Sequence, residues 1–176
     1  MVADGARHVV LVGMMGTGKT TVGRYVAALL GRPFFDSDEV VAQRADRSVR
    51  EIFEQDGEPA FRRLESAVMA DLLGGSQPSV IAGGGGAVLD EGTRVRLARS
   101  ADVVWLRASP ALLAGRLARG SDHRPLLDGH DEDVAAVLAE LGNRRDLIYE
   151  SVADHIVDID DRGPQRMAQA VVEVVS

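Results

Sequence analysis

The chain has 176 residues, a formal net charge of −7 and no cysteine, and 45% of its residues are hydrophobic. This length predicts one domain spanning 1–176. The lack of cysteine excludes disulfides and thiolate metal sites, and the acidic balance argues against a nucleic-acid-binding surface. No stretch approaches the roughly 18 apolar residues of a membrane span, and residues 1–8 lack the apolar core of a secretory signal. We therefore expect a cytoplasmic protein that binds neither nucleic acid nor a membrane.

Short apolar segments alternate with helical ones along the chain. This alternation predicts an α/β fold, a three-layer sandwich in which helices cover both faces of a parallel sheet. The expected strands are 8–13, 33–36, 79–82, 102–106 and 154–158. The expected helices are 18–31, 38–45, 48–55, 58–74, 91–99, 109–119, 131–151 and 163–175. Ligands of such sheets bind beyond the carboxyl ends of the strands, so the residues after each strand are the candidate site.

The first strand runs into the sequence GMMGTGKT, residues 13–20, which has the spacing G-x-x-x-x-G-K-[ST] of a phosphate-binding loop. In such a loop the backbone N–H groups surround phosphate oxygens. Lys19 can reach the β- and γ-phosphates, and the Thr20 hydroxyl can bind Mg²⁺. The helix that follows adds its positive amino end. The residues expected to bind nucleotide here are Gly16, Thr17, Gly18, Lys19, Thr20 and Thr21.

The second strand delivers two carboxylates, Asp36 and Asp38, to the same edge. The third strand ends in glycine and offers no acid, so Asp36 is the best available partner for Mg²⁺. Asp38 could bind a substrate hydroxyl and take its proton. The alternative, equally supported by the spacing, is that Asp38 only caps the next helix.

Two further segments carry candidate substrate-binding groups. Four successive glycines, 83–86, follow the third strand, and their backbone could approach a ligand closely and donate N–H groups. Arg62 and Glu65 are i,i+3 neighbours on one helix. The glutamate could hold the arginine so that its fork meets a carboxylate, although an exposed ion pair of little energetic value is the alternative.

Residues 116–130 combine basic residues, two glycines and one apolar pair, which is typical of a mobile lid. Closure of such a lid would bring Arg124 onto the phosphates and exclude water. A plain surface loop is the alternative. After the fifth strand, Arg162 and its neighbours could wrap a nucleotide base.

The chain resembles shikimate kinases from end to end. The segments that carry this resemblance are GMMGTGKTT, FFDSDEVV, FRRLE, GGGGAV, RPLL and R-x-x-I-Y near 145–149. The resemblance implies a fold like that of nucleoside-monophosphate kinases, with strand order 2-3-1-4-5, a substrate-binding region near 37–65 and a lid. It implies an enzyme that uses ATP and Mg²⁺ to phosphorylate the 3-hydroxyl of shikimate, giving shikimate 3-phosphate and ADP. We expect a monomer.

The resemblance also implies a role for each matching residue. Lys19, Asp38 and Arg124 would be catalytic, and Thr20 and Asp36 would serve the metal. Arg124, Arg162 and Pro164 would join the phosphate loop in binding the nucleotide. Shikimate would be bound by Asp38, Arg62, Gly84, Gly85, Gly86 and Arg145.

Three features depart from the family pattern. Leu147 stands where the family usually has proline, Gly83 is an extra glycine, and either Arg116 or Arg119 could pack on the adenine.

Other functions also have sequence support. A kinase for gluconate or a nucleoside monophosphate would share the phosphate loop. A GTP switch would use Asn143–Asp146 and Asp160–Gly163, but these motifs stand in the reverse of the usual order.

Overall fold

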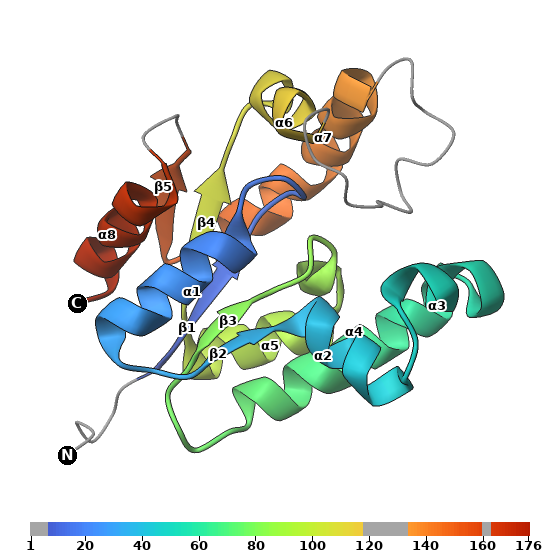
Figure 1. The fold of residues 1–176 in the computed structure, drawn as a ribbon, viewed down its shortest axis with the longest axis horizontal. Helices are drawn as coiled ribbons and strands as arrows, with labels where there is room; N and C mark the ends of the chain where they lie inside the picture. Colours follow the sequence, from blue (N-terminus) through green and yellow to red (C-terminus); the bar gives the residue numbers. More distant parts are fainter. Residues whose placement is uncertain (1–6, 118–133, 160–162) are drawn as a thin grey trace.

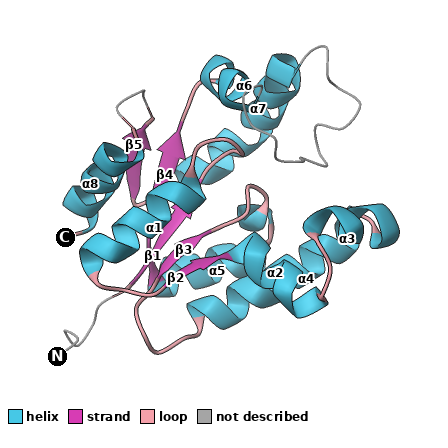
Figure 2. Cartoon of the chain, in the orientation of Figure 1, coloured by secondary structure: helices cyan, strands magenta, loops and turns pink. Residues whose placement is uncertain are grey.

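The computed structural model describes residues 7–117, 134–159 and 163–176. Its centre is a five-stranded parallel sheet with the order β2-β3-β1-β4-β5, which confirms the predicted architecture (Figures 1 and 2). The strands are β1 His8–Val12, β2 Phe34–Asp36, β3 Val80–Ala82, β4 Ala101–Arg107 and β5 His155–Asp158. Each lies within two residues of its predicted bounds.

The register of the sheet brings the ends of three strands to one level. Leu11 of β1 pairs with Ala82 of β3, and Asp36 of β2 pairs with the same residue from the other side. The Gly83 N–H then donates to the Leu11 carbonyl at 3.0 Å and continues the ladder by one residue. The phosphate loop, the two aspartates and the glycine run therefore all begin at the same edge.

Eight α-helices and one short 3₁₀ helix are described. The α-helices are α1 Lys19–Leu30, α2 Ser37–Ala45, α3 Val49–Asp56, α4 Glu58–Leu73, α5 Glu91–Ser100, α6 Pro110–Leu117, α7 Val134–Val152 and α8 Pro164–Val175. The 3₁₀ helix, Ala87–Leu89, follows the glycine run and was not predicted. Among these described helices, none is both long and apolar enough to cross a membrane.

The two faces of the sheet bury separate cores, because successive residues of each strand point to opposite faces. Val9 and Leu11 pack with residues of α1 and α8 on one face. Val10 and Val12 pack with residues of α4, α5 and α7 on the other. Figure 1 shows α1 and α8 together on one side of the sheet, with α4 and α5 beyond it.

A third small core holds the helical segment between β2 and β3. Val41 of α2, Ile52 of α3, and Phe61 and Val68 of α4 are buried together. Ser48 starts α3 with a capping box, in which its hydroxyl accepts from the Glu51 N–H and the Glu51 side chain accepts from the Ser48 N–H. This packing fixes α4, and with it Arg62 and Glu65, against the carboxyl edge of the sheet.

Two buried helix glycines should respond in opposite ways to alanine. A Cβ at Gly23 of α1 would lie 2.5 Å from the Phe34 ring, over which Arg24 also packs, whereas one at Gly142 of α7 would meet no atom closer than 3.8 Å. Gly23→Ala should lower the free energy of unfolding by about 1–3 kcal/mol. Gly142→Ala should raise it by roughly 0.5–1 kcal/mol. Urea unfolding measures both, and a stabilised Gly23→Ala variant would contradict the packing of α1 on β2.

Candidate functional site

The phosphate loop joins β1 to α1 in the geometry that the motif requires. Gly16 and Gly18 have φ angles of 82° and 87°, a region that side chains disfavour. The buried Thr17 hydroxyl donates to the Met14 carbonyl at 2.8 Å. The Lys19 ammonium donates to the Gly13 carbonyl at 2.8 Å and to the Met14 carbonyl at 3.0 Å, so the loop itself positions this charge. Because α1 begins at Lys19, its amino end faces the loop.

Asp36 connects the phosphate loop to α2. Its Oδ2 accepts a hydrogen bond from the Thr20 hydroxyl at 2.5 Å, and its Oδ1 accepts from the N–H groups of Asp38 and Glu39. Asp36 is therefore the helix cap, and the alternative that Asp38 caps this helix is wrong. The cap falls on Asp36 because α2 begins one residue earlier than predicted, at Ser37. The Asp38 side chain lies in the first turn and does not serve as the cap.

Asp38 and Glu65 converge on the glycine run. A Cβ at Gly84 would collide with the Glu65 carboxylate and would lie 2.7 Å from Asp38 Oδ1. The Gly84 N–H donates to the buried Ser37 hydroxyl at 2.8 Å, which holds the strand end beside α2. Glycine is required here because the two carboxylates approach the backbone closely.

Glu65 is the most deeply buried acid of the described site, with only 2% of its side chain exposed. Burial raises its pKa above the ordinary value; Arg62 and Arg145 act against this rise, and Asp38 adds to it. Its Oε1 atom is buried and accepts no hydrogen bond from any described residue. A buried carboxylate oxygen of this kind is well placed to accept from a ligand hydroxyl.

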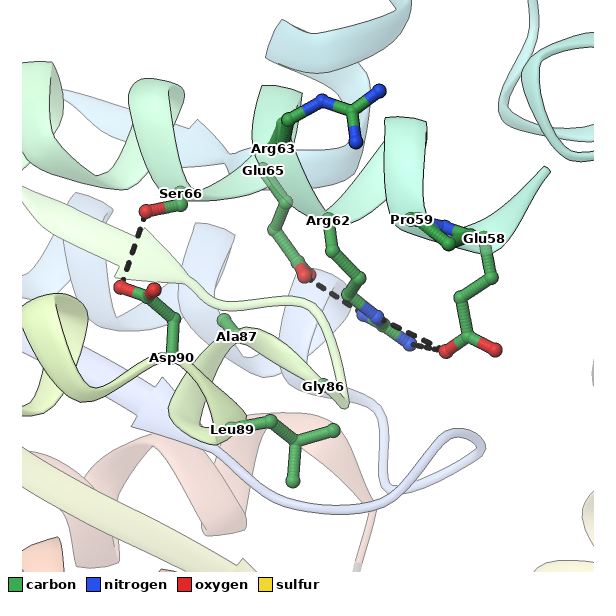
Figure 3. Close-up of a pocket in the computed structure, with 10 residues that line it drawn as sticks. All are labelled: Glu58, Pro59, Arg62, Arg63, Glu65, Ser66, Gly86, Ala87, Leu89 and Asp90. Atoms are coloured by element: carbon green, nitrogen blue, oxygen red, sulfur yellow. Dashed lines mark hydrogen bonds and ion pairs between the residues drawn. The ribbon is translucent and has the colours of Figure 1, made fainter. Parts of the chain in front are cut away.

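Arg62 lies between two glutamates of its own helix, as Figure 3 shows. Its Nη1 donates to Glu65 at 2.7 Å, and its Nε and Nη2 donate to Glu58 at 3.2 and 3.0 Å. Burial lowers the pKa of Arg62, but Glu65 and Glu58 together raise it above its ordinary value. The predicted pair with Glu65 is present. The second partner, Glu58, was missed, although its i,i+4 spacing to Arg62 is visible in the sequence.

Arg145 and Tyr149 reach the glycine run from α7. The Gly85 carbonyl accepts from Arg145 Nη1 at 3.2 Å and from the Tyr149 hydroxyl at 2.5 Å. Both side chains are at least 95% buried, and burial raises the pKa of Tyr149 to about 12. Tyr149 is part of the motif R-x-x-I-Y, but the sequence alone predicts no role for it. The signal that could have found it is its position four residues after Arg145, on the same helix face.

In the described part of the chain, cavities lie on two sides of the glycine run. A cavity of about 320 Å³ adjoins the phosphate loop, Thr20, Asp36, Asp38 and Gly83–Gly85. A second cavity, of about 570 Å³, lies between α4 and the residues after the glycine run, and Figure 3 shows its lining. Arg62 and Gly86 line the second cavity, whereas Asp38, Gly84 and Gly85 line the first. Arg145 lines neither cavity and contacts the Gly85 carbonyl from α7.

Several predicted site residues lie outside the described residues or away from the two cavities. Arg124, Arg119, Arg162 and most of the expected lid fall outside the described residues. Arg116 and Leu117 are described and line the smaller cavity, beside the phosphate loop. Pro164 is the first residue of α8 and lines neither cavity.

Comparison with known proteins gives one consistent result. The family model "Shikimate kinase" matches residues 15–176. A shikimate kinase of Caulobacter vibrioides is 46% identical over 151 residues, which cover 86% of this chain and 74% of the relative. The chain belongs to the shikimate kinase family. A solved shikimate kinase of Acinetobacter baumannii, in complex with shikimate, is 35% identical with a TM-score of 0.91, and the match covers 97% of this chain and 93% of that one.

The two alternative functions, a gluconate kinase and a GTP switch, have less support. A gluconokinase of Sinorhizobium meliloti covers 96% of the chain and 93% of its own, but at 19% identity and a TM-score of 0.56 it shares only the fold. Asn143–Asp146, the apparent guanine motif, lies inside α7, which runs from Val134 to Val152. Asp160 to Arg162 of the second motif fall outside the described residues.

The departures from the family pattern are accommodated by the structure. Leu147, in place of the usual proline, is 74% exposed on α7 and leaves Arg145 buried. The extra Gly83 extends the β1–β3 ladder through its bond to Leu11. The other three glycines, 84–86, therefore remain beyond the strand.

Proposed function

We propose that the chain is a shikimate kinase in activity, transferring the γ-phosphoryl group of ATP to the 3-hydroxyl of shikimate. The products are shikimate 3-phosphate and ADP. The observation that carries this proposal is the convergence of Asp38, Arg62 and Arg145 on one glycine run beside a phosphate loop. The Acinetobacter relative, which covers nearly the whole chain, binds shikimate. The other small acids considered above have only fold-level support.

The nucleotide would bind along the loop between β1 and α1. Its phosphates would accept from the loop N–H groups, and Lys19 would offset their charge. We assign adenine binding to Arg162 and Pro164, and we expect either Arg116 or Arg119 to pack on the adenine ring. We assign Arg124 to the transferred phosphoryl group, as the lid residue that closes over it.

The residues present fit a bound Mg²⁺. The Thr20 hydroxyl donates a hydrogen bond to Asp36, which leaves an oxygen lone pair of Thr20 available for a cation. Oxygen donors suit Mg²⁺, which keeps several waters and phosphate oxygens. No cluster of three or more acidic or histidine side chains suited to a metal occurs in the part of the chain that is described. Thr20 and Asp36 would hold the ion together with the nucleotide, and it would neutralise phosphate charge.

Substrate would bind by its carboxylate and present its hydroxyl to Asp38. Arg62 and Arg145 would pair with the carboxylate, since the arginine fork matches its two oxygens. The 3-hydroxyl oxygen would attack the γ-phosphorus while the bond from that phosphorus to the β–γ bridging oxygen breaks. Asp38 would take the hydroxyl proton, and ADP would leave with the bridging oxygen. We assign the helical region 37–65 to substrate binding, in a cytoplasmic monomer with no nucleic-acid or membrane partner.

A coupled ADP-release assay tests the proposed substrate. With ATP, shikimate should be turned over far faster than quinate, gluconate or nucleoside monophosphates. Shikimate methyl ester keeps all three hydroxyls but loses the negative charge, so its kcat/KM should fall at least about 30-fold. Gluconate turned over faster than shikimate would overturn the substrate assignment. An ester turned over as well as the acid would overturn the pairing of the arginines with the carboxylate.

Replacing Asp36 and replacing Asp38 should change different kinetic properties of the enzyme. Asp36→Asn should raise the Mg²⁺ concentration needed for half-maximal rate, because its carboxylate orders Thr20. Asp38→Asn should lower kcat by about 10²–10⁴-fold, the typical worth of a positioned general base, with its Mg²⁺ requirement unchanged. Mg²⁺ titrations of both variants measure this difference. Equal shifts in the Mg²⁺ requirement would assign Asp38 to the metal.

The two glutamates that hold Arg62 form a matched pair. Glu65 is 2% exposed and Glu58 is 46% exposed. Glu65→Gln should raise the KM for shikimate about 10-fold or more, because a buried hydrogen bond to a charged group contributes roughly 1.5–3 kcal/mol. Glu58→Gln should change this KM less than about threefold, since exposed ion pairs contribute little. Equal effects of the two variants would show that burial does not decide how Arg62 is positioned.

A further inference from the structure

One backbone carbonyl of the glycine run receives two hydrogen bonds from α7. The acceptor is Gly85, and the donors are the Tyr149 hydroxyl at 2.5 Å and Arg145 Nη1 at 3.2 Å. The Tyr149 ring has no exposed surface and packs on Trp105 with a centroid separation of 5.7 Å. Its hydroxyl also lies 3.9 Å from Met14 Sδ, in the phosphate loop. Tyr149 thus contacts both the nucleotide and the substrate segments of the proposed site.

The carbonyl direction fixes the direction of the next N–H. In a trans peptide the C=O of one residue and the N–H of the next point in opposite directions, and no cis peptide occurs among the described residues. With the Gly85 carbonyl directed at α7, the Gly86 N–H must point away from α7. Gly86 also lies against the Arg62 guanidinium, which a Cβ at this position would strike. The Gly86 N–H donates to no group in the described parts of the chain.

This peptide needs an external restraint. It joins two glycines, so the side-chain clashes that normally restrict backbone rotation are absent at both ends. A flip of the peptide would turn the Gly86 N–H toward α7 and direct the carbonyl oxygen to the opposite side. The two hydrogen bonds from α7 oppose this flip. The shorter of them comes from Tyr149.

We propose that Tyr149 is a positioning residue, whose hydroxyl fixes the Gly85–Gly86 peptide so that the Gly86 N–H donates to the substrate carboxylate beside Arg62 and Arg145. This inference rests on the proposed function. It assigns Tyr149 an indirect role, because its hydroxyl is occupied by Gly85 and does not itself bind substrate. The i,i+4 spacing places Arg145 and Tyr149 on one face of α7, so one helix orients both the arginine and the N–H.

The chemistry of the hydroxyl supports a permanent donor. Burial holds the pKa of Tyr149 near 12, so the phenol keeps its proton throughout the neutral range and donates at every working pH. A tyrosine that only filled the core could equally be phenylalanine, whose ring occupies nearly the same volume. The difference between these two side chains therefore isolates the proposed role.

The test compares Tyr149→Phe with wild type on shikimate and on shikimate methyl ester. Tyr25→Phe is the matched control, because Tyr25 is the chain's other tyrosine and is 38% exposed on α1. Tyr149→Phe should lower kcat/KM for shikimate about fivefold, the usual effect of one lost hydrogen bond. It should lower kcat/KM for the ester less than twofold and leave the KM for ATP unchanged. Tyr25→Phe should change none of these values.

The outcomes separate the inference from the proposed function. Wild-type enzyme that does not discriminate acid from ester would overturn the proposed carboxylate site itself. If wild type discriminates and Tyr149→Phe loses the same factor on both substrates, Tyr149 is only a core residue and the inference is wrong. A raised ATP KM or a lowered unfolding midpoint as the sole change would lead to the same conclusion. A loss confined to the acid would support the positioning role.

Discussion

The parallel pairing of β1, β2 and β3 is the constraint on which the rest of the structure depends. Leu11, Asp36 and Ala82 lie side by side in the register, so three functional segments leave the sheet at the same level. Each segment separately is a common feature of α/β proteins. Brought to one edge, they place a phosphate-binding loop, a pair of carboxylates and the backbone of a glycine run within reach of one small ligand.

In this acidic chain, burial shifts the pKa values of two charged side chains in the site. Glu65 is buried between Arg62 and the glycine run, where burial raises its pKa and the attraction of two arginines opposes that rise. Arg62 is held by both its glutamates before any ligand arrives. An arginine restrained in this way loses less side-chain entropy when a carboxylate binds. The two glutamates therefore fix the geometry of Arg62, and the buried Glu65 is the stronger restraint of the two.

Much of the fold and the site could be predicted from the sequence, because the relevant patterns are local. The phosphate loop, the Arg62–Glu65 spacing and the strand-to-helix alternation are each readable within a few residues. Contacts between distant segments were not readable. The hydrogen bond from Tyr149 to Gly85 joins residues 64 positions apart. The 3₁₀ helix after the glycines, Ala87–Leu89, buries Ala87 and Val88 in the core. The sequence left Asp38 open between binding a substrate hydroxyl and capping α2, and only the hydrogen bonds of Asp36 decide that Asp36 is the cap.

Asp36 carries a consequence for how this enzyme can change over time. One carboxylate accepts from the Thr20 hydroxyl with one oxygen and begins α2 with the other. A replacement at this position removes the partner of the Thr20 hydroxyl, the proposed cation ligand, and changes the start of the helix that carries Asp38. Positions 20 and 36 are therefore coupled, and Asp36 links both to the backbone of the helix that carries Asp38. Variation among relatives should instead accumulate on the exposed side of α7, where Leu147 is 74% exposed.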